Sequence, residues 1–219
     1  MDRTMIEQIV TQVLTVMSNP GEVGAAIKGI PVGISNRHIH LSAYHVEILF
    51  GKGHTLTPKK DLKQVGQYAA EETVMFVGPK GVLQRVRVLG PVRKITQVEI
   101  SSTDGFSLGI LPPLRDSGQI DGSAGLVVVG TAGAITLKEG VICAARHIHM
   151  SNEDAQRFGV SDGDRVTAET DGPRGCVFKN VLVRANSTCR LEFHIDTDEA
   201  NAVGLKNGDQ IRLPQCEVV

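Results

Sequence analysis

Arg37-His38-Ile39-His40-Leu41-Ser42 returns 109 residues downstream, counted from His38 to His147, as Arg146-His147-Ile148-His149-Met150-Ser151. In each copy two histidines alternate with hydrophobic residues, which is the period of a β-strand with two different faces. Each copy ends on a serine, a preferred residue at the start of a helix. Because self-similarity at a fixed spacing is the signature of a structural repeat, the chain is expected to contain two related halves.

Two further landmarks recur with a shorter offset. Gly78-Pro79-Lys80-Gly81 returns as Gly172-Pro173-Arg174-Gly175, 94 residues later, and Val98-Glu99-Ile100 returns as Phe193-His194-Ile195, 95 residues later. The drop in offset indicates a longer insertion in the first half, between its histidine motif and these landmarks. We expect the two halves to join near residues 130–140.

Short alternating segments, separated by turn pairs such as Asp162-Gly163 and Asn207-Gly208, fill the chain from about Ile30 onward. The clearest segments are Val82–Val88, Val98–Ser101, Arg165–Thr170, Cys176–Val183 and Leu191–Ile195. Short strands with regular turn signals favour small barrels over a parallel sheet. The sequence therefore predicts a mainly β fold, with two related small β-barrel domains and short helices.

The N-terminal segment has a different pattern. A helical period of three to four connects Met5, Ile6, Ile9, Val10, Val13, Leu14 and Met17, and it predicts an amphipathic helix over residues 1–18. Ser18-Asn19-Pro20-Gly21 would end this helix and begin a linker. Two interpretations stay open. The helix packs on its own domain or in an oligomer contact, or it is a detachable peptide that docks in a groove of a partner.

Composition excludes several classes of function. The formal net charge is −1 and no long basic run occurs, which argues against a nucleic-acid partner. No apolar stretch approaches the roughly 20 residues that span a bilayer, and a secretory signal pattern is missing. The four cysteines lack C-x-x-C spacing, as is typical of a reduced, cytosolic protein. A nucleotide-binding glycine loop, a nucleophilic serine elbow and a His-Glu-x-x-His helix are all absent.

The histidine pairs predict metal sites. Residues two apart in a strand point to the same face, so His38 and His40 project together, and so do His147 and His149. The repeat alignment adds a third candidate ligand to each pair, Glu99 in the first half and His194 in the second. Three ligands with an open position are typical of a catalytic metal, and nitrogen and oxygen donors suit zinc best, with cobalt, nickel or iron as alternatives. If the halves pack face to face, two metals lie close together. The alternative is that these are surface histidines, or core histidines bonded to the backbone.

Arg93 follows a Gly90-Pro91 turn just before the Glu99 strand, and we expect it to point toward the same site. A guanidinium group matches the oxygens of phosphate in bidentate fashion. The alternative is an ordinary surface arginine. Lys80 and Arg87 lie just upstream and could serve an anionic cofactor, or simply form the solvent face of a strand.

The longest motifs resemble those of the PduL-type phosphate propanoyltransferases, over nearly the whole chain. The stretches that carry the resemblance are Ser35–Ser42, Leu89–Arg93, Gln97–Ser101, Arg146–Ser151 and His194–Asn201. The resemblance implies two β-barrel domains with a binuclear zinc site between them. On this chain the domains would be residues 37–144 and 145–214, the second completed by strand 26–36. Residues 1–20 would be a targeting helix and linker.

The resemblance also implies an activity, the interconversion of propanoyl-CoA (or another short acyl-CoA) plus phosphate with acyl phosphate plus CoA. His38, His40 and Glu99 would hold one zinc, and His147, His149 and His194 the other. Arg93 would be the catalytic, phosphate-binding residue. The residues implied for coenzyme A binding are Ile34, Ser35, Asn36, Lys80, Arg87 and Asn201.

The expected location is the lumen of a bacterial microcompartment of the 1,2-propanediol type. Residues 1–20 would dock on shell or core proteins there, and the chain could form a homo-oligomer. Two rival functions stay open. A binuclear metallohydrolase, such as a thioesterase, would use the same ligands and release free acid. A non-catalytic assembly module of the microcompartment would have no activity to retain after deletion of residues 1–20.

Overall fold

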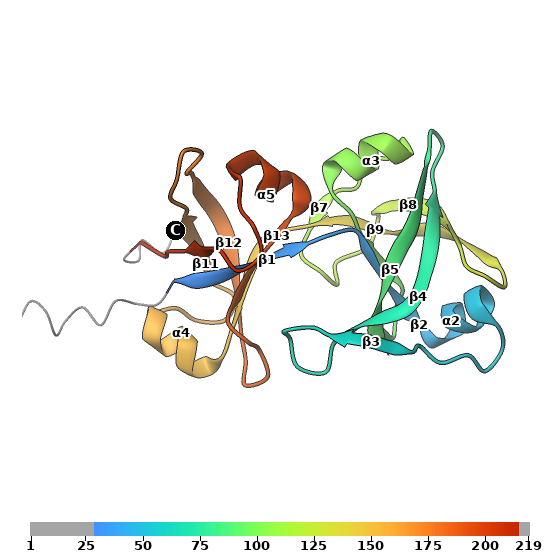
Figure 1. Cartoon of the computed structure of the whole chain (residues 1–219), viewed down its shortest axis with the longest axis horizontal. Helices are drawn as coiled ribbons and strands as arrows, with labels where there is room; N and C mark the ends of the chain where they lie inside the picture. Colours follow the sequence, from blue (N-terminus) through green and yellow to red (C-terminus); the bar gives the residue numbers. More distant parts are fainter. Residues whose placement is uncertain (1–28, 215–219) are drawn as a thin grey trace, which may run out of the picture.

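The structure, a computed structural model, describes residues 29–214. Strands dominate this part of the chain, in two sheets that form two lobes side by side (Figure 1). The mainly β prediction is therefore confirmed. The amphipathic helix expected over residues 1–18, and the linker after it, lie outside the described residues. Within residues 29–214, no helix is long and apolar enough to cross a membrane.

One lobe is a six-stranded barrel built from the later strands and the first one. The strand order is β11 (Arg165–Glu169), β12 (Val177–Ala185), β10 (His147–Met150), β13 (Glu192–Asp196), β1 (Ile30–Ser35) and β14 (Gln210–Ile211). A bridge between Glu169 and Arg212 joins the two edges and closes the sheet. The fully buried core residues include Ile30, Ile148, Met150, Val181 and Phe193.

The other lobe is an eight-stranded sheet. Its main path is β3 (Pro58–Asp61), β4 (Tyr68–Val77), β5 (Val82–Arg93), β2 (His38–Ser42), β6 (Gln97–Glu99), β9 (Ala134–Ala144) and β7 (Leu114–Arg115). The remaining strand, β8 (Ala124–Val129), pairs with both β4 and β9, so the pairing returns on itself. The core of this lobe includes Ile39, Leu41, Phe76, Val88 and Val98.

The alternation in each histidine motif separates side chains that pack in the core from side chains that point away from it. Ile39 and Ile148 are completely buried, each in the core of its own lobe. Because successive side chains of a strand point to opposite faces, the histidines on either side of these isoleucines point away from the core. Core packing thus fixes the direction in which both histidine pairs project.

The first strand belongs to the barrel formed by the last strands. β1 runs parallel to β13, with Gly33 opposite His194, and β9 runs parallel to β6, with Ile142 opposite Glu99. Ile142 lies 109 residues after Gly33, which is the offset of the histidine repeat. Each of these strands therefore completes one lobe and then leads the chain into the histidine strand of the other lobe (Figure 1). Both histidine motifs start where the lobes meet.

In the described part of the chain, four short helices follow strands: α2 (Ala43–Phe50), α3 (Ser102–Leu108), α4 (Asn152–Phe158) and α5 (Thr197–Val203). Ser42 and Ser151 are the N-caps of α2 and α4, as the serines at the ends of the two motifs predicted. Ser151 also forms a capping box with Asp154. The helices α3 and α5 come after the strands that carry Glu99 and His194. They touch across the lobes, where the Thr103 amide donates to Asp198 at 2.8 Å.

Candidate metal centre and anion site

Strand register brings each expected third ligand beside its histidine pair. His38 lies opposite Glu99 in the antiparallel pair of β2 and β6, and His147 lies opposite His194 in the pair of β10 and β13. Residues directly opposite each other share a face of the sheet. In each set of three, the ligand atoms all lie within 4.8 Å of one another. The repeat alignment that paired Glu99 with His194 therefore matches the register of the strands.

The first set, His38, His40 and Glu99, is buried. The exposed fractions of these three residues are 7%, 3% and 9%, in that order. His38 Nδ1 lies 2.8 Å from the Asn36 carbonyl, and its Nε2 lies 3.5 Å from Glu99 Oε2. His40 Nδ1 is buried without a hydrogen-bond partner. Because buried polar atoms nearly always have partners, this nitrogen calls for a ligand.

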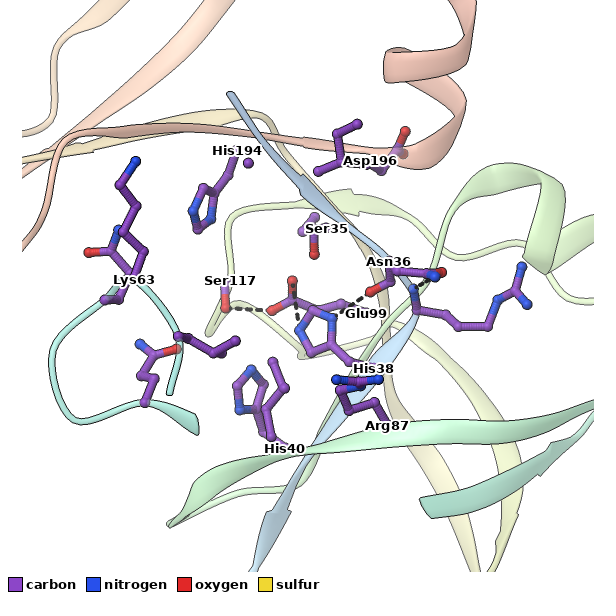
Figure 2. A pocket seen from close by; sticks show the side chains of 18 of the residues that line it. Ser35, Asn36, His38, His40, Lys63, Arg87, Glu99, Ser117, His194 and Asp196 are labelled. Atoms are coloured by element: carbon purple, nitrogen blue, oxygen red, sulfur yellow. Dashed lines mark hydrogen bonds and ion pairs between the residues drawn. The ribbon is translucent and has the colours of Figure 1, made fainter. Parts of the chain in front are cut away.

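Glu99 is held by one of its two carboxylate oxygens. Oε1 accepts hydrogen bonds from Gln97 Nε2 at 2.6 Å and from Ser117 Oγ at 2.9 Å. Gln97 is itself fixed by the Gly118 amide, which donates to its Oε1 at 2.8 Å. The other oxygen of Glu99 faces His38 (Figure 2). Burial by itself raises the pKa of Glu99, but His38 and the Ser117 hydrogen bond outweigh it, so the pKa lies below its usual value.

The second set repeats this arrangement with a histidine in place of the glutamate. His147 Nδ1 lies 2.8 Å from the Ala145 carbonyl, as His38 does from Asn36. Its Nε2 lies 3.2 Å from Nε2 of His149. Glu192 Oε2 lies 2.7 Å from His194 Nε2 and occupies the position equivalent to Gln97, two residues before the third ligand. A carboxylate ligand thus has an amide donor beside it, and an imidazole ligand has a carboxylate acceptor.

An arginine–carboxylate ion pair holds the start of each histidine strand. Arg37 binds Asp104 through two contacts of 2.6 and 2.9 Å, and Arg146 binds Glu199 at 2.8 Å. Each acidic partner lies five residues after the third ligand, in the first turn of α3 or α5. The first residue of each motif is therefore tied to the helix that follows its third ligand.

Three histidines of the two sets, His40, His147 and His149, are uncharged at neutral pH. Burial, assisted by His38 and Arg93, lowers the pKa of His40 to about 2. Burial also lowers the pKa of His147 to about 3 and that of His149 to about 4, with His194 and Arg184 as further causes. A neutral imidazole keeps a lone pair free, which is the form that binds a metal.

These pKa values predict that the metal-free protein loses stability on acidification. The folded-state pKa of each of the three histidines lies below the unfolded value near 6.5. Their contribution to the free energy of unfolding is therefore fully present above pH 6.5. It is lost as the pH falls from 6.5 toward the pKa values of the folded state. The loss is up to about 1.4 kcal/mol per pH unit for each histidine. Melting temperatures of chelator-treated protein at pH 7 and pH 5 measure the effect.

A matched pair of variants identifies the source of this slope. His149→Gln removes one of the three groups and should make the fall between pH 7 and pH 5 shallower. His54→Gln serves as the control, because His54 is bonded to Glu72 at 2.8 Å, away from both sets. An equal slope in wild type and His149→Gln would contradict the prediction.

Both sets line one cavity of about 740 Å³. It lies between the lobes, since β2 and β6 contribute to its wall from one side and β10 and β13 from the other. Figure 2 shows His38, His40 and Glu99 on one side of this space and His194 on the other. Arg93, at the end of β5, lines the same cavity. The wall therefore combines two sets of metal-type ligands with a guanidinium group.

A family model described as phosphate propanoyltransferase matches residues 31–206. The chain belongs to the phosphate propanoyltransferase family. It is 52% identical over 212 residues to a phosphate propanoyltransferase of Rhodobacter capsulatus, covering 97% of this chain and 95% of the relative. It is 55% identical over 186 residues to one of Thermotoga maritima, covering 84% and 89%. With one of Salmonella typhimurium it shares 50% identity over 208 residues, covering 94% and 95%.

Membership in the phosphate propanoyltransferase family confirms the resemblance found in the motifs. The residues expected from that resemblance to contact coenzyme A divide into two groups. Ile34, Ser35, Asn36 and Arg87 line the cavity. Lys80 and Asn201 do not belong to its wall. Lys80 is exposed in the turn after β4, next to Gly109, and Asn201 is exposed on α5.

Several cavity residues had no role in the sequence-based prediction. Ser117 lies in a loop, and Glu192 falls in the predicted segment Leu191–Ile195, where it had no function. Gln97 does not line the cavity but donates to Glu99, and it lies one residue before the predicted segment Val98–Ser101. Arg184 lies on β12, opposite His149, beyond the end of the alternating segment that the sequence suggested. The alignment of the two halves did hold a signal for Gln97 and Glu192, because both stand two residues before a proposed ligand.

Proposed function

We propose that the chain is a metal-dependent acyltransferase that interconverts propanoyl-CoA, or another short acyl-CoA, plus phosphate with acyl phosphate plus CoA. The observation that carries this proposal is that both ligand sets and Arg93 line the same cavity. The relatives at about half identity over nearly the whole chain are named phosphate propanoyltransferases, which supports the same reaction.

The residues of both sets fit metal ions. His40 has a buried nitrogen without a partner, the pKa values of three histidines favour the neutral form, and the lowered pKa of Glu99 favours the carboxylate. We propose that one ion is held by His38, His40 and Glu99, and a second by His147, His149 and His194. Nitrogen and oxygen donors in sets of three suit zinc. A bound zinc ion supplies Lewis acidity, which polarises the thioester carbonyl.

In this proposal Arg93 binds the phosphate and directs one of its oxygens to the thioester carbon. A new bond between that oxygen and the carbonyl carbon forms, the carbon–sulfur bond breaks, and the electron pair leaves with the thiolate of CoA. Holding both substrates in one cavity turns a two-body encounter into a reaction within one complex. Gln97 and Ser117 keep the Glu99 carboxylate in place through their hydrogen bonds.

Coenzyme A would enter along the segment that connects β1 to β2. Ile34 and Ser35 end β1, Asn36 follows them in the connection, and all three line the cavity, while Arg87 comes from strand β5. A guanidinium group there suits the phosphate groups of CoA. The roles of Lys80 and Asn201 in CoA binding stay predictions.

The test is CoA release from propanoyl-CoA, with and without phosphate, before and after chelation, and after readdition of zinc. We expect release to require both phosphate and metal, with acyl phosphate as the product. Release without phosphate, together with free propanoate, would instead establish a metallohydrolase. No release under any condition would overturn the proposed activity and favour an assembly module.

Location in a propanediol-type microcompartment is a separate proposal. It rests on the amphipathic pattern of residues 1–18, which lie outside the described residues. Docking on shell or core proteins and homo-oligomer formation likewise stay predictions.

A further inference from the structure

A second arginine faces the candidate metal centre from the opposite lobe. Arg184 lies directly opposite His149 in the parallel pair of β10 and β12. Residues in register on neighbouring strands project to the same side of the sheet, so Arg184 projects with His149, toward the cavity. Arg184 and Arg93 both line that cavity. One guanidinium group therefore comes from β12 in the six-stranded barrel and the other from the end of β5 in the other lobe.

These two arginines differ from those at the start of the histidine motifs. Arg37 and Arg146 are neutralised by Asp104 and Glu199. Within residues 29–214, neither Arg93 nor Arg184 has a hydrogen bond or ion pair to a carboxylate. Arg93 and Arg184 thus share a partly enclosed space, and neither is bonded to an acidic partner there.

The charges of Arg93 and Arg184 act on each other. Burial lowers the pKa of Arg93, Glu99 raises it and Arg184 lowers it again. Glu99 cannot serve as the bonded partner, because one of its oxygens is held by Gln97 and Ser117 and the other faces His38. Concentrating positive charge in a partly buried space is unfavourable unless an anion shares it. The arrangement is that of an anion site.

The repeat shows that Arg184 is not a structural feature common to both halves. His40 lies opposite Leu89 in the first lobe, in the same register in which His149 lies opposite Arg184. A leucine therefore fills the equivalent strand position without disturbing the neighbouring histidine. At this strand position an arginine occurs in the second half alone, whereas the first half has Arg87 opposite His38, so the side chain on the cavity wall is set by function and not by the repeat.

We propose that Arg184 is a second phosphate-binding residue, which together with Arg93 forms a clamp of two guanidinium groups across the two lobes. This inference rests on the proposed function, since it names a further residue for the same substrate. Phosphate carries close to two negative charges near neutral pH and offers four oxygens, which suits two guanidinium forks. With one fork from each lobe, the phosphate is bound only where the lobes meet.

The experiment compares Arg184→Ala with Arg184→Lys, and uses Arg174→Ala as the control. Arg174 is exposed in a turn and does not line the cavity. KM is measured separately for phosphate and for propanoyl-CoA, and metal content is determined for every variant. For Arg184→Ala we expect the phosphate KM to rise roughly 10- to 100-fold, from the loss of charge-assisted hydrogen bonds. The propanoyl-CoA KM should stay within about twofold, lysine should restore part of the loss, and the control should match wild type.

A second measurement does not depend on turnover. Inorganic phosphate should raise the melting temperature of the metal-loaded wild type by mass action, and this shift should shrink in both Arg184 variants. If phosphate stabilises wild type more than both Arg184 variants but no acyl phosphate forms, the proposed activity fails while the clamp is upheld. The clamp is overturned if the phosphate KM and the phosphate-induced shift are both unchanged. It is also overturned if only the propanoyl-CoA KM rises, which would assign Arg184 to the phosphates of CoA.

Discussion

Replacing Arg93 with alanine is expected to raise the KM for phosphate by roughly a hundredfold while the metal content stays that of wild type. A bidentate guanidinium–phosphate contact consists of two charge-assisted hydrogen bonds, which together are worth about 3 kcal/mol, or about two powers of ten. Arg93 lines the cavity with both ligand sets but does not belong to either of them. Its loss should therefore weaken the binding of one substrate and leave the metal ligands in place. Initial rates at varied phosphate, with propanoyl-CoA saturating, measure the effect.

Arg93→Lys separates charge from geometry. Lysine keeps the positive charge but lacks the planar fork, so the phosphate KM should fall between those of wild type and Arg93→Ala. Arg174→Ala, outside the cavity, is again the control. An unchanged phosphate KM in Arg93→Ala would remove Arg93 from this role. A loss of metal in the same variant would show that the arginine acts on the ligands instead.

The metal-type ligands were predictable because they depend on local periodicity and on the repeat. The period of two places His38 with His40 and His147 with His149, whatever the rest of the fold does. Glu99 and His194 followed from the equivalence of two segments 95 residues apart. The structure supplies the physical reason, since each is the residue opposite the first histidine of its motif. The repeat in the sequence thus corresponds to the same strand register in both lobes.

Pairing between distant strands was less accessible to sequence analysis. The parallel pairing of β1 with β13 joins residues about 160 positions apart, as from Val32 to Phe193, and nothing in the local pattern encodes such a partner. The expectation of such a pairing came from the family resemblance alone. Arg184 was missed for the same reason, because its place opposite His149 depends on which strand lies beside β10. Ser117 lies in a loop, where periodicity gives no signal at all.

Under the proposed function, replacing His147 with alanine is expected to lower activity strongly and to remove one of the two proposed metal ions. The described residues contain two separate ligand sets, so loss of one ligand should empty its own set and leave His38, His40 and Glu99 intact. Because His147 and Glu99 interact electrostatically, some weakening of the first set is also expected. Losing Lewis-acid assistance from one ion costs several kcal/mol, so kcat/KM should fall by about a thousandfold or more. Metal analysis of purified protein and the CoA-release assay measure both effects.

The metal count distinguishes catalytic loss from misfolding, because a misfolded chain would lose both ions together. His147→Gln provides a second variant of similar volume, which keeps a polar group beside the Ala145 carbonyl that His147 contacts at 2.8 Å. His54→Ala is the matched control, since His54 is bonded to Glu72 and does not line the cavity. It should retain both ions and full activity. Activity near that of wild type in a His147 variant with one ion would show that a single metal suffices. The two lobes would then share a cavity in which only His38, His40 and Glu99 hold the catalytic ion.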